Sequence, residues 1–338
     1  MKIMITGGAG FIGMHTVHRF AKHHPVHVVD NLSRRGAKAN LEWLRENVRF
    51  SFSETDIRGA AALEEEVRTF KPDAVIHLAA QVAVTTSVQD PREDFDINAL
   101  GTFNVLEAVR KQAPGAIVLY SSTNKVYGGM EDVRVELAGE RYRYAELVNG
   151  IPESYPLDFH SPYGCSKGAA DQYVRDYSRI YGMPSVVFRQ SCIYGTHQFG
   201  VEDQGWIAWF TIASALGRPI TVYGDGKQVR DVLWVDDLVS AYELALDKID
   251  QVKGEVFNMG GGPTRQLSLL ETFSGLGELS GKPIGYTFAD WRPGDQKVFV
   301  ADTRKAQRDL GWTAQVDPAS GLKMLFEWVH ENKSLFAV

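Results

Sequence analysis

The chain has 338 residues, of which 44% are hydrophobic and 23% are charged, so it can form one large globular domain or two. Its formal net charge of −6 excludes a general attraction to nucleic acid or to anionic membranes, and no apolar run reaches the length of a membrane span. Because there are only two cysteines and no signal-peptide apolar region before the first glycines, we expect a cytoplasmic protein without a disulfide framework.

The first predicted elements are a strand, a glycine-rich turn and a helix. A short apolar strand over 2–6 leads into Gly7-Gly8-Ala9-Gly10-Phe11-Ile12-Gly13, and a periodic helix pattern follows. In this arrangement Gly7 permits a tight turn, Gly10 lets the backbone approach a pyrophosphate, and Gly13 lets the helix pack on the strand. The helix N-terminus supplies N–H groups and a positive dipole end. The pattern therefore predicts a dinucleotide site.

The second predicted strand, over 26–29, ends in Asp30, seventeen residues after Gly13. A carboxylate at this place accepts hydrogen bonds from the ribose hydroxyls of the adenosine half and repels a 2′-phosphate. Asp30 thus favours NAD over NADP, a preference that Arg34 and Arg35 weaken slightly. A loop N-cap is the alternative role for Asp30.

Strand and helix patterns then alternate. Further strands are predicted over 48–52, 74–78, 116–120 and 185–189, and further helices over 60–70 and 91–109. This alternation predicts an α/β fold with a Rossmann-type, doubly wound parallel sheet. Ligands of such sheets bind at the carboxyl ends of the strands, where Asp30, Gln81 and Thr123 fall.

The second half of the chain changes character near Gln190. We expect a cofactor-binding domain over 1–190, to which a segment over about 229–260 returns with strands at 229–235 and 254–258. A smaller C-terminal α/β domain over 191–338 is expected to bind the substrate. The polar stretch 128–160 is either an insertion that covers the site or a plain surface excursion.

A candidate catalytic pair lies in Ser161-Pro162-Tyr163-Gly164-Cys165-Ser166-Lys167. Pro162 suits the first helical turn, and a tyrosine and a lysine four residues apart share one helix face. Ionising an isolated phenol at pH 7 costs roughly 4 kcal/mol, and a neighbouring ammonium lowers that cost. Tyr163 and Lys167 are therefore either a catalytic base with its partner or an exposed polar pair.

Other reactive residue types give weaker signals. The nine histidines lack the spacing of a metal site, so no metal is expected. Cys165 and Cys192 suit small buried positions, with substrate contact as an alternative for Cys192. Arg230 and Arg292 lie in loop or strand-edge contexts, where they either bind a substrate diphosphate or are solvated.

Together these residues resemble the extended short-chain dehydrogenase/reductase family of nucleotide-sugar enzymes. The motifs that carry the resemblance span nearly the whole chain: Thr6–Gly13, Asp30-Asn31-Leu32, Asp56-Ile57, His77–Ala80, Ser121–Thr123, Val126–Gly128, Tyr163 with Lys167, Arg230-Asp231 and Arg292–Asp295. The resemblance implies that Thr123, Tyr163 and Lys167 are catalytic, and that Arg230 and Arg292 hold a substrate pyrophosphate.

Within this family the chain is similar to enzymes that invert carbon 2 of a CDP-hexose. The similarity rests on Ser122–Gly128, His160–Lys167, Arg189–Gly195 and Gln198–Trp206. Thr196-His197 departs from it, since we expect Pro-Arg there. Asn124 and Lys125 stand where family dehydratases carry Asp-Glu. Open alternatives are a 4-epimerase or another NAD-dependent activity of the family, and a non-catalytic NAD-binding regulatory protein.

The resemblance also implies NAD as cofactor, a nucleotide sugar as substrate and a homodimer or homotetramer. The residues expected to bind NAD are Gly7, Gly10, Phe11, Ile12, Gly13, Asp30, Asn31, Ser33, Asp56, Ile57, Leu78, Ala79, Ala80, Gln81, Asn98, Ser121, Tyr163, Lys167 and Gln190. The residues expected to bind substrate are Thr123, Asn124, Cys192, Gln204, Arg230 and Arg292.

Overall fold

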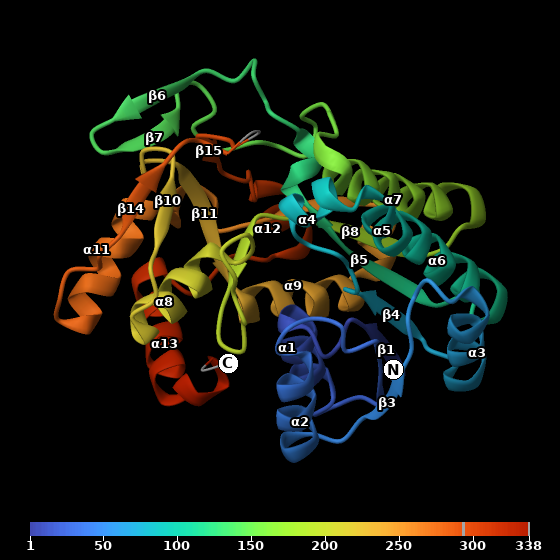
Figure 1. The fold of residues 1–338 in the computed structure, drawn as a ribbon. Helices are drawn as coiled ribbons and strands as arrows, with labels where there is room; N and C mark the ends of the chain where they lie inside the picture. Colours follow the sequence, from blue (N-terminus) through green and yellow to red (C-terminus); the bar gives the residue numbers. More distant parts are fainter. Residues whose placement is uncertain (293–294, 337–338) are drawn as a thin grey trace.

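A parallel sheet of seven strands forms the centre of the molecule (Figure 1). The computed structural model describes residues 1–292 and 295–336, so Pro293 and Gly294 of the expected Arg292–Asp295 motif lie outside the described residues. The strand order is β12-β8-β5-β4-β1-β2-β3, and all neighbouring pairs are parallel. The strands are β1 (Ile3–Thr6), β2 (Val26–Asp30), β3 (Ser51–Glu54), β4 (Ala74–His77), β5 (Ile117–Thr123), β8 (Ser185–Gln190) and β12 (Val256–Met259). The predicted doubly wound α/β fold is confirmed.

Helices cover both faces of this sheet. Five of its strands, β1, β2, β4, β8 and β12, are buried along their whole length, which explains their continuous apolar runs. One apolar cluster unites the sheet with α3 (Ala60–Phe70), α6 (Gly101–Gln112) and α7 (Ser161–Tyr181). Another cluster includes α1 (Phe11–Phe20), α2 (Ala37–Asn47) and α9 (Val235–Asp247). Shorter helices are α4 (Val84–Gln89), α5 (Pro91–Phe95), α10 (Ile249–Val252) and α12 (Arg304–Leu310).

The helix predicted over 91–109 is interrupted by a π-helical turn. Asp96–Leu100 forms this wider turn between α5 and α6, and it includes Asn98. A π turn adds one residue to the helical repeat, which changes the direction of the side chains on either side. The apolar periodicity of the segment does not reveal this insertion.

The second half of the chain builds a smaller α/β layer beside the first (Figure 1). Its strands are β9 (Cys192–Tyr194), β11 (Val229–Trp234), β13 (Gln266–Ser268) and β15 (Val298–Phe299), with β10 (Thr221–Tyr223) and β14 (Thr287–Ala289) in a separate pair. Its helices are α8 (Trp206–Leu216), α11 (Leu269–Ser280) and α13 (Pro318–Glu331).

Only part of the segment 229–260 returns to the central sheet. The strand expected over 254–258 does so, because β12 pairs with β8. The strand expected over 229–235 does not, since β11 pairs with β9, β13 and β15 in the second layer. Its placement in the central sheet was wrong, because the same apolar pattern suits a strand in either sheet.

The polar stretch before α7 folds as part of the second layer. β6 (Val135–Ala138) and β7 (Arg141–Tyr144) form an antiparallel hairpin. The N–H of Tyr142 donates to the carbonyl of Lys227 at 3.0 Å, and the hydroxyl of Tyr144 donates to the carbonyl of Val298 at 3.1 Å. The hairpin is therefore packed against β11 and β15.

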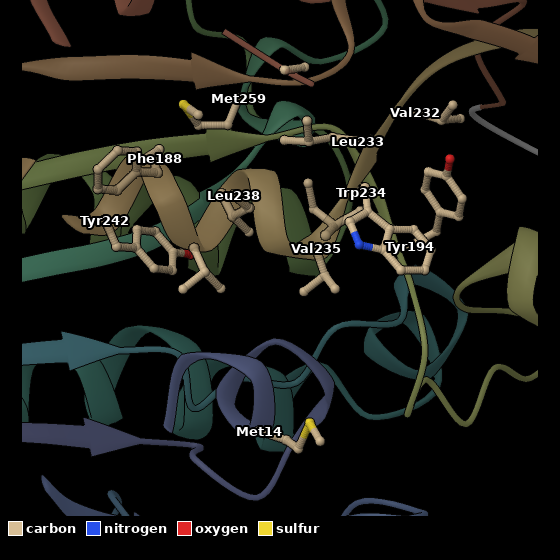
Figure 2. Packing of buried hydrophobic residues seen from close by; sticks show 14 of the residues in the cluster. Met14, Phe188, Tyr194, Val232, Leu233, Trp234, Val235, Leu238, Tyr242 and Met259 are labelled. Atoms are coloured by element: carbon tan, nitrogen blue, oxygen red, sulfur yellow. The ribbon is translucent and has the colours of Figure 1, made fainter. Parts of the chain in front are cut away.

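One residue, Ser191, joins the two layers between β8 and β9. Its N–H donates to the carbonyl of Met259 in the central sheet at 2.8 Å, while its hydroxyl donates to Asp231 in the second sheet. Apolar side chains continue across this joint, and Figure 2 shows Phe188 and Tyr242 followed along the same row by Trp234 and Tyr194. In the part of the chain that the structure describes, no helix has the length and apolarity needed to cross a bilayer.

Candidate active site

The turn between β1 and α1 is packed so closely against neighbouring backbone that two of its glycines cannot carry a side chain. Gly7 has a positive φ of 71°, and a Cβ on it would lie 2.6 Å from the backbone N of Ala79. A Cβ on Gly13 would lie 2.0 Å from the carbonyl O of Gly7, so α1 can approach β1 only with glycine there. Gly10 is the N-cap of α1 and offers no side-chain cap. The turn therefore presents backbone at a helix N-terminus, which suits a dinucleotide pyrophosphate.

Asp30 ends β2 beside this turn and is buried. Its carboxylate accepts hydrogen bonds from the N–H of Ala9 at 3.0 Å and of Leu32 at 2.8 Å. Burial raises the pKa of Asp30, while these backbone donors act in the opposite direction. These hydrogen bonds fix the carboxylate at the carboxyl end of β2, where the sequence predicts a contact with the ribose of the cofactor.

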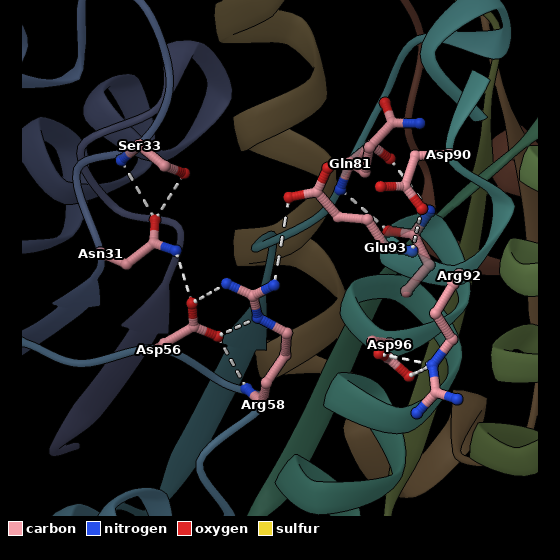
Figure 3. A network of polar contacts seen from close by, with 10 residues as sticks. Asn31, Ser33, Asp56, Arg58, Gln81, Asp90, Arg92, Glu93 and Asp96 are labelled. Atoms are coloured by element: carbon pink, nitrogen blue, oxygen red, sulfur yellow. Dashed lines mark hydrogen bonds and ion pairs between the residues drawn. The ribbon is translucent and has the colours of Figure 1, made fainter.

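A polar network links the loops after β2 and β3 (Figure 3). The amide of Asn31 accepts from both the N–H and the hydroxyl of Ser33, and donates to Asp56 at 2.8 Å. Asp56 is also bound by the guanidinium of Arg58, which lowers the pKa of Asp56 to about 2. Arg58 approaches Glu93 of α5 at 4.0 Å. The network brings together three of the residues predicted to bind NAD: Asn31, Ser33 and Asp56.

The loop after β4 is held by the π turn. Gln81 and Asn98 exchange two hydrogen bonds, in which the Gln81 N–H donates at 2.9 Å and the Asn98 amide donates to the Gln81 carbonyl at 3.1 Å. Asp94 accepts from the Gln81 amide at 2.9 Å and from the Ser166 hydroxyl at 2.5 Å. This buried network ties the β4 loop to α7.

Asp94 and Ser166 were not predicted. The spacing of Asp94 and Asn98, four residues apart on one helix, and the position of Ser166 beside Lys167 were the available signals. The remaining predicted cofactor residues lie along the same edge of the sheet: Phe11 and Ile12 in the first turn of α1, Ile57 after β3, Leu78, Ala79 and Ala80 after β4, and Ser121 in β5.

Tyr163 and Lys167 occupy the first turns of α7, facing the end of β5. Pro162 lies in the first turn, and the N–H of Tyr163 donates to the hydroxyl of Ser87 at 3.1 Å. The Lys167 ammonium donates to the carbonyl of Ser121 at 2.5 Å and lies 4.4 Å from the centre of the Tyr120 ring. Tyr163 and Lys167 are both buried, which excludes the alternative interpretation that they are an exposed polar pair.

Burial dominates the electrostatics of this pair. It raises the pKa of Tyr163 to about 12, while a hydrogen bond from Thr123 and the charge of Arg34 act to lower it. Burial also lowers the pKa of Lys167 to about 7, against the attraction of Asp171 and Asp94. The phenol is therefore neutral near pH 7 in this structure, and its ionisation requires additional positive charge nearby.

Thr123 ends β5 next to Gln190, the last residue of β8. The Thr123 hydroxyl donates to the amide oxygen of Asn124 at 3.4 Å and accepts from the N–H of Lys125 at 3.3 Å. The Gln190 amide donates to the hydroxyl of Tyr242 at 2.7 Å. The structure thus brings Thr123, Asn124 and Gln190 to the same sheet edge.

The other residues predicted to bind substrate, Cys192, Gln204, Arg230 and Arg292, come from the second layer. Burial is the main cause that raises the pKa of Cys192 to about 12, so its thiol is protonated and is no nucleophile. Arg230 donates to the carbonyl of Val229 at 2.8 Å, and its charge helps burial to lower the pKa of Lys125 to about 8. Arg292 pairs with Asp203 at 3.0 Å and lies 3.8 Å from the centre of the Tyr223 ring.

Arg34 connects the two layers. Its guanidinium donates to the amide oxygen of Gln204, a predicted substrate residue, at 3.1 Å, and it lies close enough to Tyr163 to affect the phenol pKa. The sequence had suggested for Arg34 only a weak influence on cofactor choice. No local pattern could place it at the phenol, since the contact depends on how the layers pack.

The departure at Thr196-His197 has a packing explanation. The His197 ring lies 4.8 Å from the ring of Trp43 and 5.0 Å from that of Trp328. Burial lowers its pKa to about 4, so the imidazole is neutral. The side chain fills an aromatic cluster between α2 and α13.

Comparison with protein-family models decides the class. Residues 3–260, which include the glycine turn, Asp30, Thr123, Tyr163 and Lys167, match the NAD dependent epimerase/dehydratase family. The chain belongs to this family. Membership in the NAD-dependent epimerase/dehydratase family confirms the predicted extended short-chain dehydrogenase/reductase resemblance, the enzyme class and NAD as the cofactor.

Individual relatives of the family match along their whole length. The chain is 44% identical over 335 residues to CDP-paratose 2-epimerase from Salmonella typhi, covering 97% of this chain and 99% of that protein. It superposes with a TM-score of 0.85 and 33% identity on UDP-glucose 4-epimerase from Thermotoga maritima solved with UDP-glucose, covering 98% and 100%. UDP-glucose 4-epimerase from Thermus thermophilus in complex with NAD matches with a TM-score of 0.81 and 31% identity, covering 98% and 100%.

Proposed function

We propose that this protein inverts carbon 2 of a CDP-hexose of the CDP-paratose and CDP-tyvelose type. The observation that carries the proposal is the 44% identity, over nearly the whole of both chains, to a CDP-paratose 2-epimerase. The convergence of Thr123, Tyr163 and Lys167 at the carboxyl end of β5 supports it, because the glycine turn lies at the carboxyl end of β1 in the same sheet and an epimerase needs a base next to the cofactor.

The glycine turn and Asp30 fit NAD, since the turn presents the uncapped N-terminus of α1 and a buried carboxylate borders it. NAD held by this turn and Asp30 would supply a reversible hydride acceptor for the sugar carbon, so that the hydride can return to the opposite face of that carbon. Tyr163, as phenolate, takes the proton from the hydroxyl on the same carbon and later gives it back. Lys167 favours the phenolate by its charge, and Thr123 donates a hydrogen bond to the reacting oxygen.

Asn124 and Lys125 favour epimerisation over dehydration. Elimination of water needs a base for a carbon-bound proton and an acid for the leaving hydroxyl. An amide does not titrate, and Lys125 must first lose its charge, although burial lowers its pKa to about 8. Epimerisation needs neither group. We therefore assign inversion without loss of water to this site.

The substrate would lie between the two layers. We assign the diphosphate to Arg230 and Arg292, and the nucleotide and sugar contacts to Asn124, Cys192 and Gln204. In this assignment residues 1–190, with α9 and β12, form the cofactor domain, and the remainder of 191–338 forms the substrate domain. The contact between Arg34 and Gln204 supports a site shared by both layers.

We also infer a cytoplasmic homo-oligomer, either a dimer or a tetramer. Large apolar side chains are exposed along α5, the π turn, α6 and α7: Phe95, Leu100, Phe103, Tyr173, Ile180 and Tyr181. Phe103 and Tyr173 touch, with ring centres 5.8 Å apart, so this surface is continuous across α6 and α7. Light scattering should give a multiple of the chain mass, and Tyr173→Asp with Ile180→Asp should give the monomer.

A 4-epimerase is the second candidate, favoured by the TM-score of 0.85 to a UDP-glucose 4-epimerase. Purified protein should be incubated with CDP-, UDP-, GDP- and dTDP-hexoses and the products read by NMR. Inversion at carbon 2 of the CDP sugar supports the proposal, and inversion at carbon 4 favours the second candidate. In deuterated water, deuterium at carbon 2 would show proton removal from carbon and would contradict the hydride mechanism.

A further inference from the structure

A second cavity, outside the proposed active site, is lined by positive side chains. It has a volume of about 980 Å³ and lies between the C-terminal half of α7, the start of β12, and α12. Arg175 follows Lys167 by eight residues on α7, roughly 12 Å along the helix axis. The cations that line the cavity are Arg175, Arg179, Arg189, Arg304, Lys305 and Arg308.

Four of these cations already have carboxylate partners. The pairs are Arg189 with Asp171 at 2.9 Å, Arg304 with Asp302 at 2.6 Å, Lys305 with Glu255 at 2.6 Å, and Arg308 with Asp309 at 2.7 Å. These pairs neutralise four of the six cations that line the cavity.

Arg175 and Arg179 have no carboxylate within 4.0 Å among the described residues. Like charges one helical turn apart destabilise a helix unless an anion compensates them. Arg175 donates only a long hydrogen bond, 3.4 Å, to the amide of Gln172, and its Nε is buried without a partner in the described part of the chain. The helix dipole favours Arg179, which is in the last turn, but Arg175 lies outside that turn.

The remaining carboxylate of the cavity does not neutralise the pair. Glu153 accepts a hydrogen bond from the backbone N–H of Asn258 at 2.8 Å, and burial raises its pKa. Burial, followed by the charges of Arg179 and Arg189, lowers the pKa of Arg175, while the charges of Asp171 and Glu255 act in the opposite direction. The cavity therefore holds two adjacent cations, Arg175 and Arg179, with which no carboxylate of the described residues is directly paired.

We propose that this cavity binds the di- or triphosphate group of a small molecule, at a site separate from the NAD and substrate sites. Guanidinium groups bind phosphate through paired N–H donors, and two of them one turn apart present two such forks side by side. That arrangement matches linked phosphates better than a single carboxylate. The volume is in the range of small-molecule pockets.

Calorimetry of inorganic pyrophosphate binding to the full-length, NAD-loaded protein tests the site, because NAD then occupies the glycine turn. Four proteins should be compared: wild type, Arg175→Ala with Arg179→Ala, Arg68→Ala as a control that removes an arginine from α3, outside the cavity, and Arg292→Ala. We expect saturable binding to wild type, Arg68→Ala and Arg292→Ala, and at least tenfold weaker binding to the double variant. Arg179→Ala alone, a change at an exposed side chain, keeps the test valid if the double variant does not fold, and should bind several-fold more weakly.

Three results would overturn the proposal: no saturable binding to wild type, equal binding to wild type and the double variant, or binding lost in Arg292→Ala but kept in the double variant. The last result would place pyrophosphate in the proposed substrate site. Cytidine and adenosine triphosphates form a second arm. Affinities equal to that of pyrophosphate would show that the phosphates alone are recognised, and tighter binding that depends on Arg175 would show that the nucleoside adds contacts.

Discussion

Replacing Tyr163 with phenylalanine removes only the phenolic oxygen from the proposed base. The pKa of about 12 in this structure means that ionisation at pH 7 costs about 7 kcal/mol, from five pH units at 1.36 kcal/mol each. A positive nicotinamide ring and the Lys167 ammonium are the groups that would lower this pKa in the working enzyme. We expect Tyr163→Phe to reduce kcat by about 10²–10⁴-fold, the usual contribution of a general base.

The assay is epimerisation of a CDP-hexose measured from pH 6 to pH 10. Because a base acts only when deprotonated, wild-type kcat/KM should rise tenfold per pH unit below the phenol pKa, and Tyr163→Phe should lose this rise. Tyr177→Phe is a matched control on the same helix, since its hydroxyl donates to Glu107 at 2.8 Å, away from the site. Near wild-type rates in Tyr163→Phe, or an unchanged pH profile, would refute the role of Tyr163.

Further predictions concern the charged groups. Lys167→Ala should be severely impaired at pH 7 and partly recover at high pH, and a loss that does not change with pH would argue against its electrostatic role. Arg292→Ala should weaken nucleotide-sugar binding by about 2–5 kcal/mol in calorimetry, whereas unchanged affinity would make Arg292 a solvated surface residue. Nucleotide released by denaturing the purified protein should be mainly NAD, because Asp30 repels a 2′-phosphate, and mainly NADP would contradict this. Arg189→Met leaves the fully buried Asp171 without a cationic partner and with hydrogen bonds from Ser122 and Gln172, so denaturant unfolding should show a loss of about 3–5 kcal/mol, and a loss below about 1 kcal/mol would show that these hydrogen bonds suffice.

Local patterns predicted the cofactor layer well, because its determinants are close in sequence. The glycines of the first turn, the buried strands and the carboxylate of Asp30 each act within a few residues of one another. The Tyr163 and Lys167 spacing also depends on a single helix. In these cases backbone geometry and burial leave few alternatives, so the residue types predict the structure directly.

Features that depend on tertiary packing could not be predicted. The strand over 229–234 has an apolar pattern that suits either sheet, and its position follows from the neighbouring β9. The π turn around Asn98 is specified by its hydrogen bonds with Gln81 and Ser166, which are distant in sequence. The approach of Arg34 to Tyr163 likewise depends on both layers being in place.

The joint at Ser191 has a consequence for how the molecule unfolds. The N–H of Ser191 is hydrogen-bonded to the central sheet and its hydroxyl to the second sheet. The two sheets therefore cannot move apart without breaking one of these hydrogen bonds. The apolar cluster that runs from Phe188 to Tyr194 crosses the same point. Heating should therefore melt both layers in one cooperative transition, with equal calorimetric and van't Hoff enthalpies, instead of two separate steps.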